Sequence, residues 1–196
     1  MNNGSLVNVK AATAAEICTH FELKKEAQAL LCDTMGPREF LQVLVANKQY
    51  IAGIDFIAQA LPAREAIWWG CLCLQHANGN DLSELDKAAC RMAVKWVLEP
   101  TEGNRIAAKE PAEKAGQSCP AGALAAASHL TEDAFGLPDA GRKPAFAGAK
   151  SVAGAVKLAS TKADPSRIVD THRLFLELGI GVAEGRFRWP EIDKRV

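Results

Sequence analysis

The sequence predicts an all-α protein, arranged as an irregular bundle of many helices. Apolar residues recur three and four positions apart in one segment after another, which is the spacing of a helix face. Proline and glycine separate these segments into short units. Nowhere do apolar and polar residues alternate over a useful length with β-branched enrichment, as a strand requires. Because no fixed-period repeat is visible, we prefer an irregular multi-helix bundle to stacked helical hairpins.

Composition limits the function classes. The chain has 196 residues, of which 48% are hydrophobic and 23% charged, enough for a full core without a disulfide or metal. The 23 basic and 23 acidic residues cancel, which gives no support to nucleic-acid or anionic-membrane binding. No secretory signal and no run of about 18 apolar residues is visible. We therefore expect a cytoplasmic protein without cofactor or metal, away from membranes and nucleic acid.

The chain divides into four parts. We expect a flexible N-terminus at 1–12, a main helical domain at 13–132, a Gly/Pro-rich loop at 133–149, and a C-terminal helical hairpin and tail at 150–196. The hairpin is expected to pack on the main domain. The loop is predicted because glycine and proline are closely spaced from Gly136 onward.

The first helices follow from caps and apolar stripes. Thr13 and Glu16 form a capping box that starts a helix. Leu23 to Cys32 continues an apolar face, and the next helix follows Gly36-Pro37. Tyr50 to Leu61 repeats the same pattern and completes the N-terminal part.

The tryptophan helix, Leu61 to Leu74, is the clearest single element. Pro62 suits its first helical position. From Ala66 to Leu74 every side is apolar, which predicts a buried central helix.

Further helices follow the tryptophan helix. Asp81 or Ser83 caps the next one. Pro100 and Thr101 end it and begin another, which Pro111 should kink or split. A helix of small residues is expected from Pro120 to Leu130.

Two helices, Val152 to Ala163 and Ile168 to Leu178, are expected after the loop. Gly179, Gly181 and Gly185 are expected to end regular structure.

The cysteines raise two chemical hypotheses. All six are expected in helices or at their ends, reduced and packed as small hydrophobic residues: Cys18, Cys32, Cys71, Cys73, Cys90 and Cys119. A metal site from Cys73, His76 and Cys90 lacks a fourth ligand. Cys119 lies near a helix N-terminus, where a thiol pKa is lowered, and His129 is the nearest histidine in sequence. Packing is the preferred interpretation of both.

A polar edge beside the tryptophans is the predicted contact region for a protein partner. It consists of Arg64, Glu65, Glu99 and Arg105, with Trp69 and Trp96 beneath. Arg64 is placed to stack on an indole, and Glu65 to accept an indole N–H or pair with Arg105. Core packing is the competing interpretation of the tryptophans.

Charged segments have simpler interpretations. Arg105 and Lys109 are expected to share one helix face. The basic, aromatic tail Arg186 to Trp189 is expected to fold back onto its own domain rather than dock on a partner.

Several motifs together resemble an uncharacterised family of bacterial cytoplasmic proteins. They are Leu61–Cys73, Trp96–Arg105, and Pro120–Leu124 followed by Val152–Leu158. Members of that family are often encoded near type VI secretion genes, beside adaptor proteins that load toxic effectors. The resemblance implies a non-enzymatic adaptor or co-chaperone that binds a secretion adaptor or effector, with no catalytic residues to transfer. The alternatives are an immunity protein that neutralises a toxin and, less favoured, a cysteine- or metal-dependent enzyme.

Overall fold

The computed structural model describes residues 5–78, 82–131, 147–162 and 165–190, and this part of the chain contains helices and no strand. The predicted all-α bundle is confirmed. None of the helices in these ranges is long and apolar enough to cross a membrane. The elements are α1 (Ala14–Cys18), α2 (Lys25–Gln28), α3 (Pro37–Ala46), α4 (Tyr50–Ala60), α5 (Ala63–Asn78), α6 (Glu84–Leu98), α7 (Glu102–Ala107), α8 (Lys109–Ala115), α9 (Pro120–His129), α10 (Ala149–Ser160), a 3₁₀ turn (Pro165–Arg167) and α11 (Ile168–Ala183).

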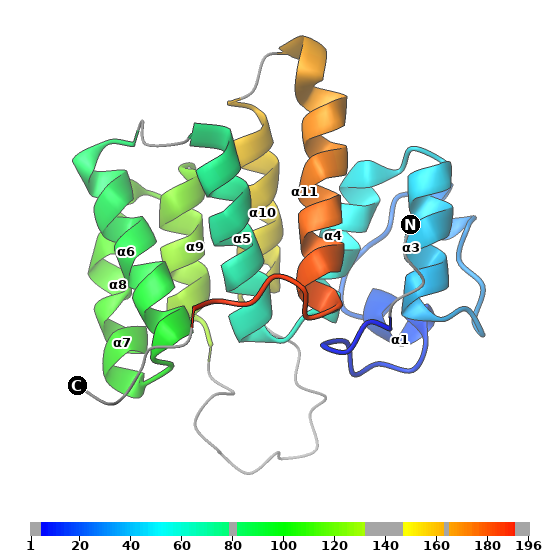
Figure 1. Cartoon of the computed structure of the whole chain (residues 1–196), viewed down its shortest axis with the longest axis horizontal. Coiled ribbons are helices and arrows are strands. Elements are labelled where there is room, and N and C mark those ends of the chain that lie inside the picture. Colours follow the sequence, from blue (N-terminus) through cyan, green and yellow to red (C-terminus); the bar gives the residue numbers. More distant parts are fainter. Residues whose placement is uncertain (1–4, 79–81, 132–146, 163–164, 191–196) are drawn as a thin grey trace.

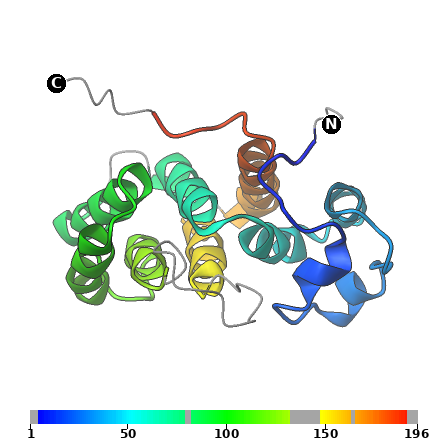
Figure 2. The ribbon, with the colours of Figure 1, turned by 90° about the horizontal axis from the view of Figure 1, so that it is seen from below.

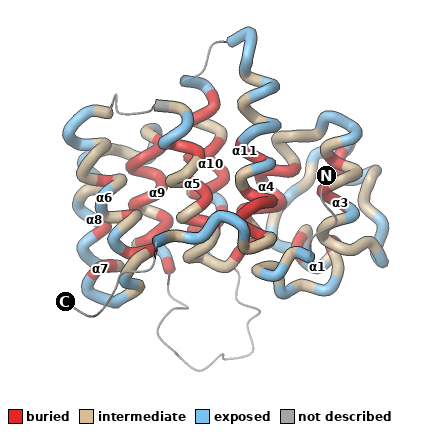
Figure 3. Tube along the Cα trace, viewed as in Figure 1, coloured by how far each residue is buried: buried red, intermediate tan, exposed pale blue. Residues whose placement is uncertain are grey.

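Helix α5 stands at the centre of the bundle (Figure 1). It packs against α6 and α9 on one side and against α10 and α11 on the other. Helices α7 and α8 extend the first side, while α1 and α3 lie at the opposite end of the molecule beyond α4 (Figures 1 and 2). Buried residues concentrate in α4, α5, α9, α10 and the second half of α11 (Figure 3).

Local sequence explains most helix boundaries. The Thr13 and Ser83 hydroxyls accept hydrogen bonds from the Glu16 and Asp86 backbone N–H groups at 3.3 and 3.1 Å, as N-caps do. Thr101 caps α7 in the same way. The predicted break near Pro111 is confirmed, because the chain forms α7 and α8 separated at Ala108.

Two sequence expectations about helix extent are wrong. Within Leu23 to Cys32 only α2 is helical, because four residues without a side-chain N-cap cannot propagate a longer helix. Cys32 is consequently exposed and outside any helix. Gly179 and Gly181 do not end α11, which continues to Ala183.

Close packing explains Gly179. A Cβ at this position would lie 2.8 Å from Ile57 Cγ2 and 3.0 Å from Trp69 Nε1. The absence of a side chain lets Trp69 donate its indole hydrogen to the Phe175 carbonyl at 2.8 Å. Of the three glycines Gly179, Gly181 and Gly185, only Gly185 has a positive φ, 73°, which suits the left-handed conformation after a helix end.

Residues 184–190, here called the C-terminal strap, cross the face of α5 after α11 ends (Figure 2). The Trp68 indole donates to the Phe187 carbonyl at 3.2 Å. The Arg64 guanidinium lies 4.1 Å from the Trp189 ring centroid. The tail therefore folds back on its own domain as predicted, as far as Pro190.

The other chain segments of the predicted division are partly described. Asn8 donates its backbone and side-chain N–H groups to Ala183 and Val182 carbonyls at 2.9 and 2.8 Å, so this part of the expected N-terminus lies against the end of α11. Most of the expected loop at 133–149 lies outside the described residues.

Candidate functional site

An apolar groove lies between α5 and α6. Trp68, Cys71 and Leu72 form one wall, and Cys90 and Val94 form the other. Its volume is about 220 Å³. Leu74, Gln75 and Leu82 complete the lining. These apolar wall residues are half-buried, so the expectation that α5 is buried on every side is corrected.

Packing geometry explains why this side of α5 is only partly covered. Trp68, Cys71, Leu72 and Gln75 share one face because they are three and four positions apart. The neighbouring helices α6, α9, α10 and α11 cover the other faces. The strap then passes over the Trp68 end. The groove therefore remains as a partly covered apolar surface.

Basic side chains follow the outer edge of the groove. Lys87, Arg91 and Lys95 succeed one another at intervals of four along α6, beside Cys90 and Val94. Lys87 forms an ion pair with Glu84 at 2.8 Å. Arg91 and Lys95 are exposed. Positive charge thus borders the apolar surface on the α6 side.

Arg64 from the predicted contact region holds α5 to the end of α6. Its guanidinium donates to the Val97 carbonyl and, at 3.1 Å, to the Leu98 carbonyl. These carbonyls belong to the last turn of α6, where a cation is stabilised by the helix dipole. Arg64 does stack on an indole, but the ring is that of Trp189 in the strap rather than one in the tryptophan helix. Arg64 therefore connects α6 to the strap.

Glu65 follows Arg64 in the first turn of α5. Its side chain is half-buried, and this burial raises the pKa of the carboxyl group. Arg64 and Lys10 partly oppose that rise through their positive charge.

Arg105 and Glu99 have separate environments. Arg105 forms two hydrogen bonds of 2.7 Å with the Glu102 carboxylate and donates to the His129 carbonyl. Glu102 thus takes the place of Glu65 as its partner. Glu99 is exposed at the C-cap of α6, and its carbonyl accepts from Asn104 at 2.8 Å. Arg105 and Lys109 lie on different helices, so the predicted shared face is wrong.

Trp69 and Trp96 belong to the core. Their exposed fractions are 0% and 1%. The indole N–H of Trp69 bonds to Phe175, whereas the Trp96 Nε1 has no hydrogen-bond partner among the described residues. Within α5, the tryptophan that reaches the partly exposed surface is Trp68. Its exposure is not predictable from the sequence, because Trp68 and Trp69 both lie in an entirely apolar run.

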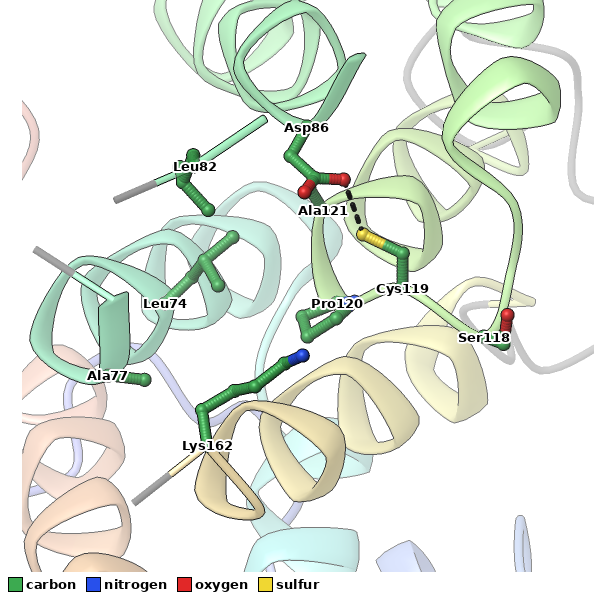
Figure 4. Close-up of a pocket in the computed structure, with 9 residues that line it drawn as sticks. All are labelled: Leu74, Ala77, Leu82, Asp86, Ser118, Cys119, Pro120, Ala121 and Lys162. Atoms are coloured by element: carbon green, nitrogen blue, oxygen red, sulfur yellow. Dashed lines mark hydrogen bonds between the residues drawn. The ribbon is translucent and has the colours of Figure 1, made fainter. Parts of the chain in front are cut away.

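A second, polar cavity surrounds the start of α9 (Figure 4). Its volume is about 450 Å³. The Cys119 thiol donates to Asp86 Oδ1 at 2.8 Å. Ser118 and Lys162 also line the cavity. The only side-chain hydrogen bond among the residues drawn in Figure 4 is that between Cys119 and Asp86.

The electrostatics of this cavity favour a protonated thiol. Desolvation, and then the hydrogen bond to Asp86, raise the pKa of Cys119. That same hydrogen bond lowers the pKa of Asp86. His129 lies at the far end of α9, with Nδ1 3.2 Å from the Arg105 carbonyl. The Cys119 and His129 pair considered from the sequence is therefore not formed, and a thiolate nucleophile gains no support.

The remaining cysteines show no metal-binding arrangement. Among the residues described, no group of three or more His, Cys, Asp and Glu side chains could hold a metal ion. Cys73 is buried, His76 is exposed, and Cys90 shares the groove with Cys71 instead. All six cysteines are free thiols. Burial raises the pKa of Cys71 and Cys73, and raises that of Cys18 and of Cys90 to about 11.

Comparison with known proteins places the chain in a family. No curated protein and no solved structure matches it. The model of a family of unknown function, DUF6931, matches residues 40–183. This range contains both walls of the groove and the whole of α11, and it ends just before the C-terminal strap. The match covers well over half of the sequence, and the chain therefore belongs to the DUF6931 family.

Proposed function

We propose that this protein is a non-enzymatic, protein-binding adaptor whose α5–α6 groove receives apolar side chains of a partner. The observation that carries the proposal is the partly exposed apolar surface of Trp68, Leu72 and Val94 on an otherwise well-packed central helix pair. The groove volume of about 220 Å³ is below the roughly 300–1,000 Å³ of small-molecule pockets. A groove of this size therefore suits a few side chains of a partner protein better than it suits a whole metabolite.

The partner that we propose is a type VI secretion adaptor or effector in the cytoplasm, with this chain acting as a co-chaperone during effector loading. Support comes from the resemblance of the Leu61–Cys73 and Trp96–Arg105 segments to proteins encoded beside such genes. The raised pKa of the Cys119 thiol gives no support to the enzyme alternative, because a nucleophilic cysteine needs the thiolate.

A matched pair of substitutions tests the groove. The protein is co-expressed with the adaptor and effector encoded next to its gene, and complexes are purified through the partner. Val94→Asp places a carboxylate in the apolar groove and should reduce recovery at least tenfold, since binding an apolar partner would remove water from that charge. Val169→Asp makes the same change on α11 at a side chain that is 55% exposed, and recovery should be unchanged.

Three outcomes contradict the proposal. Equal recovery of both variants excludes the groove, and recovery of neither adaptor nor effector with the wild type excludes the partner class. Protection of growth against the effector, with no gain in its secretion, identifies an immunity protein instead. Improved secretion without growth protection supports the adaptor.

A further inference from the structure

The charge beside the groove indicates which partner segment it accepts. Arg91 and Lys95 are exposed and one helical turn apart, directly beside Cys90 and Val94. At the other wall, Trp68 donates a hydrogen bond to Phe187 of the strap. The residues on either side of Phe187, Arg186 and Arg188, are exposed.

Acidic groups also lie along α6: Glu84, whose pKa Lys87 and Arg91 both lower, Asp86, whose charge acts on Cys90, and Glu99 at the C-cap. Glu84 is paired with Lys87, and Glu184 is bonded to both Arg38 and Arg186. Asp86 accepts from Cys119 and lines the other cavity, and Glu99 lies at the C-cap of α6, so Arg91 and Lys95 are the exposed charged residues beside Cys90 and Val94 in the middle of the groove. A partner with negative charge flanking its apolar residues is electrostatically complementary to this edge.

The shape of the groove favours a helical segment. Both walls are helices, so side chains of a third helix at positions i, i+3, i+4 and i+7 can enter the space between them. An extended peptide gains much of its affinity from a free sheet edge, and the described residues contain no strand.

We propose that the α5–α6 groove binds an acidic amphipathic helix of the partner protein. The apolar face of that helix contacts Trp68, Leu72 and Val94, while its Asp or Glu residues face Arg91 and Lys95. This inference rests on the proposed function and specifies the chemistry of the partner segment.

The experiment compares three synthetic peptides of about 18 residues, five turns of helix. One has an apolar face flanked by Glu, the second has the same apolar face flanked by Lys, and the third is a scrambled acidic sequence without an apolar face. Binding to the full chain is measured by fluorescence anisotropy, and the Trp68 indole N–H resonance reports occupation of the groove. The acidic amphipathic peptide should bind at least tenfold more tightly than either other peptide. Its advantage over the Lys peptide should shrink in about 0.5 M salt.

Charge reversal supplies the second arm. Arg91→Glu with Lys95→Glu should reverse the preference in favour of the Lys peptide. Lys24→Glu with Lys25→Glu makes the same charge change at exposed residues at the start of α2 and should leave the preference unchanged. The blue ribbon that contains α2 lies at the end of the molecule opposite α6 (Figure 1).

Four results would each overturn the acidic-helix inference. In three of them the acidic amphipathic peptide binds no more tightly than the Lys peptide, no more tightly than the scrambled peptide, or not at all. The fourth is that charge reversal at Arg91 and Lys95 leaves the peptide preference unchanged. None of these results decides the proposed function, which depends on the response of the natural partner to Val94→Asp.

Discussion

Gly179 allows the two central parts of the core to meet. Trp69 comes from α5 and Phe175 from α11, and their hydrogen bond passes the position where a Gly179 side chain would be. The indole N–H is fully buried, so losing its acceptor would leave a desolvated donor. The close approach of α4, α5 and α11 therefore depends on the absence of one methyl group.

Gly179→Ala should lower the free energy of unfolding by about 1–3 kcal/mol, as overpacking of a core does. The added Cβ would lie 2.8 Å from Ile57 and 3.0 Å from Trp69, and helix propensity would recover only part of that cost. Urea denaturation measures the change.

Gly154→Ala is the matched control, because no heavy atom lies within 4 Å of its added Cβ in α10. This variant should be more stable by about 0.5–1 kcal/mol, the ordinary gain from replacing a helical glycine. A stability of Gly179→Ala equal to or above wild type would contradict the packing explanation.

The surroundings of Trp68 and Trp69 could be predicted only in part from the sequence. Trp68 and Trp69 are adjacent, so one helix step separates their directions by about 100°. In an amphipathic helix, polar residues would indicate which direction faces solvent. The run from Ala66 to Leu74 has none, and the partly exposed face depends on which neighbouring helices pack where. A tryptophan core was therefore predictable from the sequence. The prediction placed Trp69 in the contact region, where the structure has Trp68.

The C-terminal strap begins with backbone hydrogen bonds, in which the Arg186 and Phe187 N–H groups donate to the Gly181 carbonyl at 2.9 and 3.3 Å. Side chains attach it further along, through the Trp68–Phe187 hydrogen bond and the stacking of Arg64 on Trp189. Trp189 packs against the core without being fully buried. Such an attachment opens locally at a lower free-energy cost than the helical core unfolds.

Trp189→Ala should open the strap without unfolding the bundle. Loss of the cation–π contact is worth about 1 kcal/mol, which corresponds to roughly fivefold more open strap. Cleavage by trypsin after Arg186 and Arg188 should accelerate by that factor, as measured by mass spectrometry. Ile106→Ala, at an exposed apolar residue of α7, should leave the cleavage rate unchanged. An unchanged rate in Trp189→Ala would show that other contacts hold the strap.

Helix boundaries were predicted well where their causes are local. Hydroxyl caps at Thr13, Ser83 and Thr101 and the break before Pro111 depend on residues within one turn. The extension of α11 through Gly179 and Gly181 depends on partners far away in the chain. A sequence interpretation treats such glycines as helix ends, because the packing that requires them is not visible locally.

Buried thiols are distributed over the whole molecule and make its stability depend on alkaline pH. The fold raises the pKa of Cys18 and Cys90 to about 11, and burial is the main cause in both. In an unfolded chain a thiol ionises near pH 8.5. Between these values the unfolded state loses protons that the folded state keeps, so stability falls as pH rises.

The midpoint of urea denaturation should therefore be lower at about pH 10 than at about pH 8. Cys90→Ala removes one of the contributing thiols and should show a smaller decrease than wild type. Cys32→Ala, at the exposed cysteine, should retain the wild-type decrease. Identical pH dependence of all three proteins would show that other groups govern the alkaline loss.

The long separation between Trp69 and its acceptor has a consequence for synthesis. The hydrogen bond joins residues 106 positions apart. At a translation rate of about 5–20 residues per second, the Phe175 carbonyl is made roughly 5–20 s after the indole. During that interval α5 lacks the α10 and α11 surfaces that complete its burial. The nascent chain therefore presents the tryptophan helix to the cell for seconds, long enough for ribosome-associated chaperones to bind it.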